Sequence, residues 1–293
     1  MNLRSIFLLI PLLLLCLIAS SFQNKDTLNT VLFKLTHPKT NTTSYLFGTH
    51  HAFGKAFFDT LINANQALIH SNLLITENLN VPGEMAQDII NARKETTTWK
   101  KYLNKTDLYF VDSLFAQSPT DYHKMTPTEM HVFLTRHFKQ TFCLQKQAAD
   151  TTLSLDNYIA SLAKANEIKT LGLETTKEQI ALINKDVEGM PRKVHKRRLS
   201  NIIELLQSEN PNYCEETDWY ANMQINYKRK HPCHNTLMLT NRNNKWITIL
   251  DQNLQTQNCF IAVGLSHLMY ECGLLNQLEV LGYEIVPVEL NKE

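Results

Sequence analysis

The sequence predicts an α/β fold: a central mixed β-sheet with flanking helices and a helical cap inserted on one side. Two observations predict this class. Short apolar runs, typical of buried strands, alternate with stretches in which apolar residues recur at helical spacing. That alternation favours a mixed or parallel sheet covered by helices. A mostly polar, helical stretch over residues 83–147 interrupts the alternation and predicts the cap.

Local signals set the expected order of elements. Apolar runs at 31–35 and 44–47 flank a turn-rich segment, 37–41, and predict a β-hairpin. The pair Thr126-Pro127, followed by Glu129, predicts a helix with proline in its first position. Further helices are expected over 57–69, 155–165, 194–207, 215–227, 246–254 and 274–281. Further strands are expected over 73–77, 168–173, 259–263 and 283–288.

The first 22 residues have the pattern of a secretory signal peptide. Arg4 precedes an apolar core at 6–18 and a small-residue cleavage site at 19–21. The alternative is an uncleaved anchor, because the apolar run approaches the ~20 residues that span a bilayer. The protein is therefore expected to be exported, to the periplasm, the cell envelope or the medium. Residues 23–293 are expected to form one domain, with 83–150 as its helical cap or insertion.

The charge balance excludes one class of partner. A net charge of +1 gives no general electrostatic reason to expect nucleic acid. Membrane contact is expected only through the N-terminal segment, if that segment stays uncleaved. The basic cluster at 192–198 is expected to form the solvated face of a helix.

Five cysteines follow the signal segment, so at least one stays unpaired within the chain. Cys214 and Cys233 are close enough in sequence to bridge a helical hairpin, although only geometry decides such a pairing. No Cys-x-x-Cys spacing occurs, so zinc-thiolate and thioredoxin-like chemistry has no support. A cysteine nucleophile has no support either.

Two Gly-x-x-His motifs are the most informative feature for function. Gly48 to His51 follows the apolar run 45–47, and Gly264 to His267 follows the run 260–263. A glycine at a strand end lets the backbone turn sharply and approach a ligand, and a histidine three residues later can project over the sheet edge. Two such imidazoles could share a divalent metal. The alternative is that each histidine only caps its strand turn through a hydrogen bond.

Two acids also end apolar runs, and both are candidates for the same site. Glu77 and Glu174 could ligate a metal, activate a water, or pair with Arg242. Glu77 is ranked first as the catalytic acid, whereas Glu174 could instead cap the helix after it. Arg242 could stabilise an oxyanion, or hold Glu77 in a buried ion pair. His50 is expected to support the site or pack, and Asn243 to cap the helix near Trp246.

Several of these features occur in a fixed order along the chain: Tyr45-Leu46-Phe47-Gly48-Thr49-His50-His51, Glu77, Gly172-Leu173-Glu174-Thr175 with Gln179, Arg242-Asn243, Val263-Gly264-Leu265-Ser266-His267-Leu268, Gly273-Leu274 and Gly282-Tyr283. Together they resemble the TraB/GumN family, which includes the Tiki proteins. The resemblance implies a fold related to the erythromycin-esterase and ChaN-like group. It also implies a Tiki-like metalloprotease site, with His51 and His267 and, less directly, Glu77 and Glu174 as metal ligands.

The leading functional expectation is an exported metal-dependent hydrolase acting on a peptide or small-molecule substrate. In it His51, His267, Glu77 and Glu174 bind Mn²⁺, Co²⁺ or Zn²⁺, while Glu77 and Arg242 carry the catalysis. One alternative is a metal-independent, esterase-like hydrolase in which a histidine activates water. A second alternative is a non-catalytic protein that binds a peptide, a polysaccharide or haem.

Overall fold

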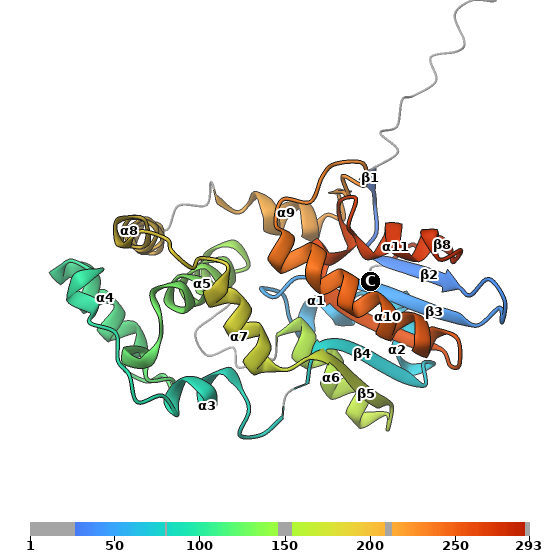
Figure 1. Ribbon diagram of the computed structural model, residues 1–293, viewed down its shortest axis with the longest axis horizontal. Helices are drawn as coiled ribbons and strands as arrows, with labels where there is room; N and C mark the ends of the chain where they lie inside the picture. The colour runs from blue at the N-terminus through green and yellow to red at the C-terminus, as the bar shows by residue number, and fades with distance from the viewer. Residues whose placement is uncertain (1–26, 80, 146–153, 209–212, 291–293) are drawn as a thin grey trace, which may run out of the picture.

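A computed structural model describes residues 27–79, 81–145, 154–208 and 213–290 of the chain (Figure 1). The predicted signal segment, 1–22, lies outside the described residues. The main sheet has six strands in the order β5-β4-β7-β3-β2-β8, and a separate two-stranded ribbon pairs β1 with β6. The strands are β1 Thr27–Leu28, β2 Leu32–Thr36, β3 Thr43–Thr49, β4 Leu73–Asn78, β5 Lys169–Glu174, β6 Ile225–Asn226, β7 Cys259–Gly264 and β8 Glu284–Pro287. The predicted α/β class with a mixed sheet is confirmed.

Strand direction explains how distant motifs come together. The neighbours β5, β4, β7 and β3 are parallel, whereas β2 is antiparallel to both β3 and β8. Across the β3–β7 pair, Thr49 lies opposite Gly264, and across the β4–β5 pair, Asn78 lies opposite Glu174. The carboxyl ends of four strands therefore meet at one edge of the sheet, where α/β folds generally place their sites.

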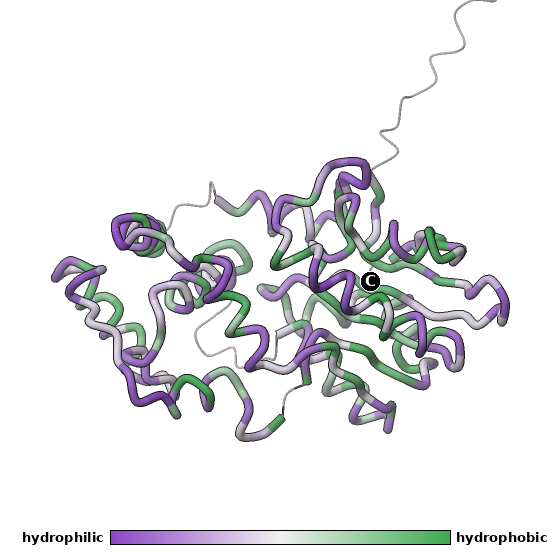
Figure 2. Tube along the Cα trace, viewed as in Figure 1, coloured by the Kyte–Doolittle hydropathy of each residue, from purple (hydrophilic) through white to green (hydrophobic). Residues whose placement is uncertain are grey.

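Helices cover both faces of this sheet, and α10 crosses in front of it in Figure 1. Every residue of the central strand β7 is buried, as expected for a strand packed on both sides. Apolar segments accordingly follow the strands in Figure 2. Around the sheet lie α1 Lys55–Asp59, α2 Ile62–Ile69, α6 Leu155–Ala165, α7 Thr176–Lys185, α9 Glu215–Ala221, α10 Asn241–Leu254 and α11 Leu274–Val280.

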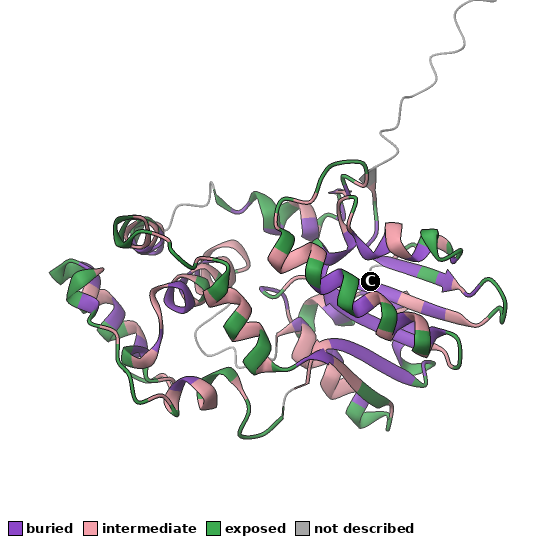
Figure 3. Ribbon diagram, in the orientation of Figure 1, coloured by how far each residue is buried: buried purple, intermediate pink, exposed green. Residues whose placement is uncertain are grey.

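The remaining helices form a layer with an apolar cluster of its own, seen at the left of Figures 1 and 3. They are α3 Ala86–Asn91, α4 Lys105–Phe115, α5 Pro127–Phe138 and α8 Arg192–Ser208, with short turns η1 Trp99–Lys101, η2 Tyr122–Lys124 and η3 Lys139–Cys143. Buried Met130 and Leu134 of α5 share this cluster with Leu199 and Ile203 of α8. The helical layer thus combines residues from the predicted insertion 83–150 with a helix from much later in the chain.

Several expected elements occur as predicted. The hairpin of β2 and β3 is confirmed. The helix at Pro127 begins with a capping box, in which Thr126 and Glu129 each bond the other's backbone N–H. In the basic cluster, Lys196 and Arg197 are exposed on α8. No helix among the described residues has the length and apolar character needed to span a bilayer.

Three predicted helices have different bounds. The helix expected over 57–69 is interrupted between α1 and α2, because the chain turns at Thr60. The helix expected over 215–227 ends at Ala221, since Ile225 and Asn226 pair with β1 after a turn at Met223, whose φ is 56°. The helix expected from Trp246 begins at Asn241, directly after the π-helical turn η5 Thr236–Thr240. Asn243 therefore lies inside α10 and does not cap it.

Two disulfides cross-link the fold. Cys143 pairs with Cys214, and Cys233 pairs with Cys272, so the Cys214–Cys233 bridge considered from sequence is not formed. Cys259 is free and buried in β7. The first disulfide joins the end of the helical layer to the start of α9, and the second joins the segment before η5 to the segment after the second Gly-x-x-His motif.

Candidate functional site

His267 lies in the short 3₁₀ turn η6 (Leu265–Leu268) after β7, and its side chain is 3% exposed. Its Nδ1 lies 2.6 Å from Oδ1 of Asn243, and its Nε2 lies 2.9 Å from Nη1 of Arg242. Because Arg242 can only donate, Nε2 of His267 accepts and Nδ1–H donates to Asn243. Burial lowers the pKa of His267 to about 4, so the ring is neutral near pH 7.

Arg242 is the centre of the buried charge network. Its Nε and Nη2 donate to Glu174, at 3.0 and 2.9 Å, and Nη2 also donates to Glu77 at 2.7 Å. Its Nη1 donates to Nε2 of His267 and, at 3.4 Å, to the carbonyl of Met238. All five guanidinium hydrogens therefore have acceptors. The structure thus shows Arg242 in the ion pair considered from sequence, with no N–H left over for an oxyanion in this arrangement.

Glu174 is held from two sides. It accepts the Arg242 donors, and its Oε1 also lies 3.1 Å from Nε1 of Trp246. The Arg242 guanidinium stacks over the Trp246 ring, 4.6 Å from its centroid. The expected helix cap belongs instead to Thr175, which forms a capping box with Glu178 at the start of α7. Glu174 therefore does not cap α7, because its carboxylate binds Arg242.

Glu77 is the last residue but one of β4, and its side chain is 11% exposed. Its Oε2 accepts from Arg242 and from Nε2 of Gln179, and its Oε1 accepts the N–H of Gly264 at 2.7 Å. Burial alone would raise the pKa of Glu77, but the surrounding positive charge and the Gly264 N–H lower it. Glu77 is therefore ionised at neutral pH.

The motif glycines serve close packing. A Cβ atom on Gly264 would lie 3.0 Å from Oε1 of Glu77, and one on Gly48 would lie 2.7 Å from Cδ1 of Leu265. Neither glycine has a positive φ. Among the described residues, the glycines with a positive φ are Gly83, Gly189 and Gly282. Neither position therefore needs a left-handed backbone, whereas close approach is what the site requires, because Gly264 brings its N–H onto a carboxylate.

His51 has a different environment from His267. Its side chain is 61% exposed, and its Nδ1 lies 2.8 Å from Oδ2 of Asp156. Asp156 also accepts from Oγ1 of Thr49 at 2.6 Å. The Asp156 carboxylate raises the pKa of His51 to about 9. Burial alone would raise the pKa of Asp156, but His51 and the Thr49 hydroxyl lower it to about 2.

Asp156 was missed by sequence reasoning. It stands in the first turn of α6, where an acid is common for reasons of helix stability alone. No motif joins it to His51, which is 105 positions away. Only the packing of α6 against the end of β3 brings the carboxylate to the ring.

The structure brings the sequence-predicted site residues together at one sheet edge. The charge of His51 shifts the pKa of both Glu77 and His267, so the three groups are close enough to interact electrostatically. Arg242 joins Glu77, Glu174 and His267 directly. His51 stands at the solvent side of this group, Arg242, Glu174 and His267 are buried, and the Glu77 side chain is 11% exposed.

The His50 side chain points away from this group of residues, packs against aromatic rings and forms a hydrogen bond with α9. Its ring lies against Phe53 and Tyr220, and its Nε2 lies 3.2 Å from Oε1 of Glu216 in α9. Lys139 of η3 binds the other oxygen of Glu216. The hydrogen bond from His50 is the main cause that lowers the pKa of Glu216 to about 2. His50 therefore links the first motif to the helical layer.

The donor set can be tested against a divalent metal. Within the described part of the chain, no three His, Cys, Asp or Glu side chains converge as a metal would require. Glu77 and Glu174 already bind Arg242, whose positive charge lies where a cation would have to sit. In this arrangement the residues do not fit a metal, because a second cation would meet the guanidinium.

The fold and site define an α/β protein with histidines, acids and an arginine gathered at the carboxyl ends of parallel strands. The chain belongs to the TraB/PrgY/gumN family, whose model matches residues 31–287. The family resemblance seen in the sequence is thereby confirmed, while the relation to the erythromycin-esterase and ChaN-like group stays a prediction. No curated protein and no solved structure matches the chain.

Proposed function

We propose that the protein is a hydrolase that cleaves a peptide or ester carbonyl, with Glu77 as general base and His51 as general acid. The observation that supports this best is a difference between two interacting neighbours. The pKa of His51 is raised to about 9, so its ring is protonated at neutral pH. The pKa of Glu77 is lowered, so its carboxylate is ionised. Groups whose surroundings hold them in opposite protonation states are suited to acid and base roles.

The proposal gives each group a role. The Glu77 carboxylate accepts a proton from a water molecule as the water oxygen attacks the carbonyl carbon. His51 carries its Nδ1–H to Asp156, so its Nε2–H is the one directed away, able to protonate the leaving nitrogen or oxygen as the bond breaks. Arg242 serves as a positioning residue, because its bonds fix Glu77 and His267 in place.

A metal-dependent peptidase is the second candidate, and one observation favours it. Both histidines are held at Nδ1 by an oxygen acceptor, which is the usual arrangement of metal-bound imidazoles. To bind Mn²⁺, Co²⁺ or Zn²⁺, however, His51 would have to lose its proton and His267 would have to release Arg242. This version therefore needs a rearranged site.

The test uses the protein expressed from residue 23 and a panel of unstructured peptides and aryl esters, with and without a strong chelator. We expect hydrolysis that survives chelation and falls at least about 100-fold in both His51→Ala and Glu77→Gln, in line with the loss of a general acid or base. His70→Ala is the matched control, since the His70 side chain is exposed at the end of α2 and bonds the carbonyl of Gln66.

Each other outcome points to another function. Activity lost to the chelator and restored by Mn²⁺, Co²⁺ or Zn²⁺, with metal found by elemental analysis in wild type but not in a His51→Ala, His267→Ala double variant, would support the metal-dependent peptidase. Peptide or haem binding without any cleavage would support the non-catalytic alternative. Full activity in both site variants would refute the proposed assignment.

A further inference from the structure

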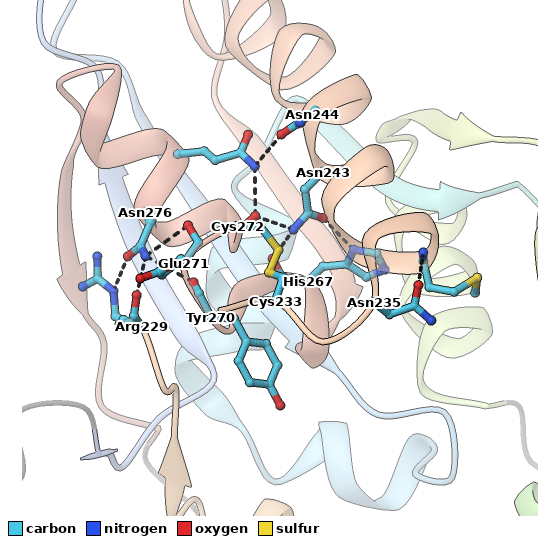
Figure 4. The surroundings of a disulfide bond; sticks show 12 residues. Arg229, Cys233, Asn235, Asn243, Asn244, His267, Tyr270, Glu271, Cys272 and Asn276 are labelled. Atoms are coloured by element: carbon cyan, nitrogen blue, oxygen red, sulfur yellow. Dashed lines mark hydrogen bonds between the residues drawn. A yellow bond between two sulfur atoms is a disulfide. The ribbon is translucent and has the colours of Figure 1, made fainter. Parts of the chain in front are cut away.

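The disulfide between Cys233 and Cys272 lies beside the buried histidine of the site (Figure 4). Cys272 belongs to the segment that follows η6, and Cys233 lies just before Asn235, whose side chain caps η5. Asn243 contacts both sides of this region: it bonds the His267 ring and also the carbonyl of Cys272. The cross-link and the site thus share one amide side chain.

The Asn243 amide has only one satisfactory orientation. Its Nδ2 donates to the carbonyls of His267 at 3.1 Å and Cys272 at 2.8 Å, and its Oδ1 accepts from Nδ1 of His267. A flipped amide would place its oxygen against two carbonyl oxygens. Asn243 is 0% exposed, so water cannot replace these partners. The two carbonyls therefore determine which atom faces the imidazole.

The position of the Cys272 carbonyl depends on a strained segment. Tyr270 has a φ of 68°, in the left-handed region that non-glycine residues rarely adopt. At the next turn Gly273 packs so tightly that a Cβ atom would lie 2.5 Å from the carbonyls of Leu268 and Met269. Backbone bonds from Tyr270 to Tyr227 and from Glu271 to His231 attach this segment to the chain that leads to Cys233. The disulfide closes that connection covalently.

We propose that the Cys233–Cys272 disulfide and Asn243 act together as positioning groups for His267, so that the site is complete only in the oxidised protein. The disulfide fixes the carbonyl of Cys272, that carbonyl fixes the Asn243 amide, and the amide holds the proton of His267 on Nδ1. Nε2 is then left as an acceptor towards Arg242. Reduction removes the covalent restraint and lets His267 exchange its tautomer and lose its bond to Arg242.

The consequence for activity depends on the proposed hydrolase function, but the consequence for His267 does not. A chain whose site needs an oxidised disulfide stays inactive in a reducing compartment and gains activity where disulfides form. For an exported hydrolase, which we expect from residues 1–22, this would confine hydrolysis to the far side of the membrane. The inference therefore names the redox state of one bond as the regulator of the site.

The chain offers its own control. Cys143–Cys214 is a second disulfide that joins η3 to α9, and neither cysteine shares a hydrogen bond with His267 or Asn243. Removing it also takes one covalent cross-link from the fold. An effect that comes only from the loss of a covalent cross-link should appear when either disulfide is removed. An effect on His267 should appear only when Cys233–Cys272 is removed.

The experiment measures the tautomer of His267 by nitrogen NMR at pH 7, in protein labelled with ¹⁵N-histidine and assigned with His267→Asn. Wild type and Cys143→Ser/Cys214→Ser should show a single tautomer with the proton on Nδ1. Cys233→Ser/Cys272→Ser, and wild type under a mild reductant, should show exchange between tautomers and a loss of activity of about tenfold or more. Asn243→Ala should show the same exchange with its disulfide intact.

The outcomes separate this inference from the proposed function. A single Nδ1–H tautomer in folded Cys233→Ser/Cys272→Ser, in reduced wild type or in Asn243→Ala would overturn the inference, whatever the activity. Equal exchange in both cysteine variants would overturn it too, since the effect would then be general. Tautomer exchange only in the expected samples, in a protein with no hydrolase activity at all, would support the inference and refute the proposed function.

Discussion

The two Gly-x-x-His motifs lie on adjacent parallel strands, yet they give their histidines opposite environments. His51 is 61% exposed and binds a carboxylate, and its pKa is raised to about 9. His267 is 3% exposed and binds an amide, and its pKa is lowered to about 4. The same tetrapeptide pattern therefore yields one cation and one neutral ring, because the partner of Nδ1 and the depth of burial decide the charge.

The difference follows from where each motif leaves the sheet. The second motif follows β7, the fully buried central strand, and α10 covers its histidine with Trp246 and Asn243. The first motif follows β3 into a turn whose residue 51 is open to solvent. The α6 residue Asp156 reaches this turn, and its side chain binds the His51 ring. The position of each strand in the sheet thus gives different environments to two motifs that share the Gly-x-x-His pattern.

The largest expected effect is on the buried half of the site. Arg242→Ala would leave Glu77 and Glu174 without their buried partner, which should cost about 3–5 kcal/mol of unfolding free energy. Urea unfolding at pH 7 measures this. Lys245→Ala, which removes an exposed pair with Glu178, should cost below about 1 kcal/mol. Equal costs for the two variants would show that the network is not buried as described.

Exchanging the Nδ1 partners should bring the pKa values of the two histidines closer together. In Asp156→Asn the pKa of His51 should fall from about 9 towards its ordinary value of 6.5, because the carboxylate is its largest cause. In Asn243→Asp the pKa of His267 should rise above about 4, since a carboxylate favours the charged ring. Proton NMR titration with a chelator present measures both. Each variant leaves the other histidine as an internal control, and unchanged pKa values would contradict the explanation.

A smaller effect is expected from substitution of the motif glycines, and it should again differ between the two motifs. Gly264→Ala places a methyl group 3.0 Å from Oε1 of Glu77, so we expect a loss of activity and about 1–3 kcal/mol of stability. Gly48→Ala meets the buried Leu265 at 2.7 Å from Cδ1 and 3.3 Å from Cα, away from Glu77, so we expect a similar cost in stability with a smaller loss of activity. Denaturant unfolding and turnover measure the pair. A greater loss of activity in Gly48→Ala would contradict the assignment of Glu77.

The smallest single contribution belongs to His51 and concerns the pH dependence of stability, where the two histidines act in opposite directions. The raised pKa of His51 gives stability that is present below pH 6.5 and is lost as pH rises towards about 9. The lowered pKa of His267 gives stability that is present above pH 6.5 and is lost as pH falls towards about 4. Because His51 is exposed, its contribution should stay below about 1 kcal/mol.

Comparison with single variants isolates each contribution. The stability difference between wild type and Asp156→Asn should be greatest between about pH 4 and 6.5, and should shrink above pH 6.5 as His51 loses its proton. Asp156→Asn should leave the loss between pH 6.5 and 4 in place, since that loss belongs to His267. A difference that grows above pH 6.5 would contradict the sign of the His51 contribution.

Local patterns in the sequence were sufficient for the strands and for most helices. The runs at 73–77 and 259–263 predict β4 and β7 to within one residue at either end, because a short apolar run between turn signals allows few other structures. The end of α9 at Ala221 could not be predicted, since the pairing of β6 with β1 joins segments nearly 200 positions apart. Helical spacing carries no information about such a partner.

The sequence by itself determined the α/β class, the family, and the gathering of the two motif histidines with Glu77, Glu174 and Arg242, because strand ends and motif order can be recognised from local sequence. Only the tertiary structure decided the charge of each histidine, the occupation of Arg242 by two carboxylates, and the choice of disulfides. These depend on Asp156 and Asn243 reaching imidazoles from other elements of the fold. Burial and hydrogen-bond partners set protonation, and both exist only once distant segments have packed together.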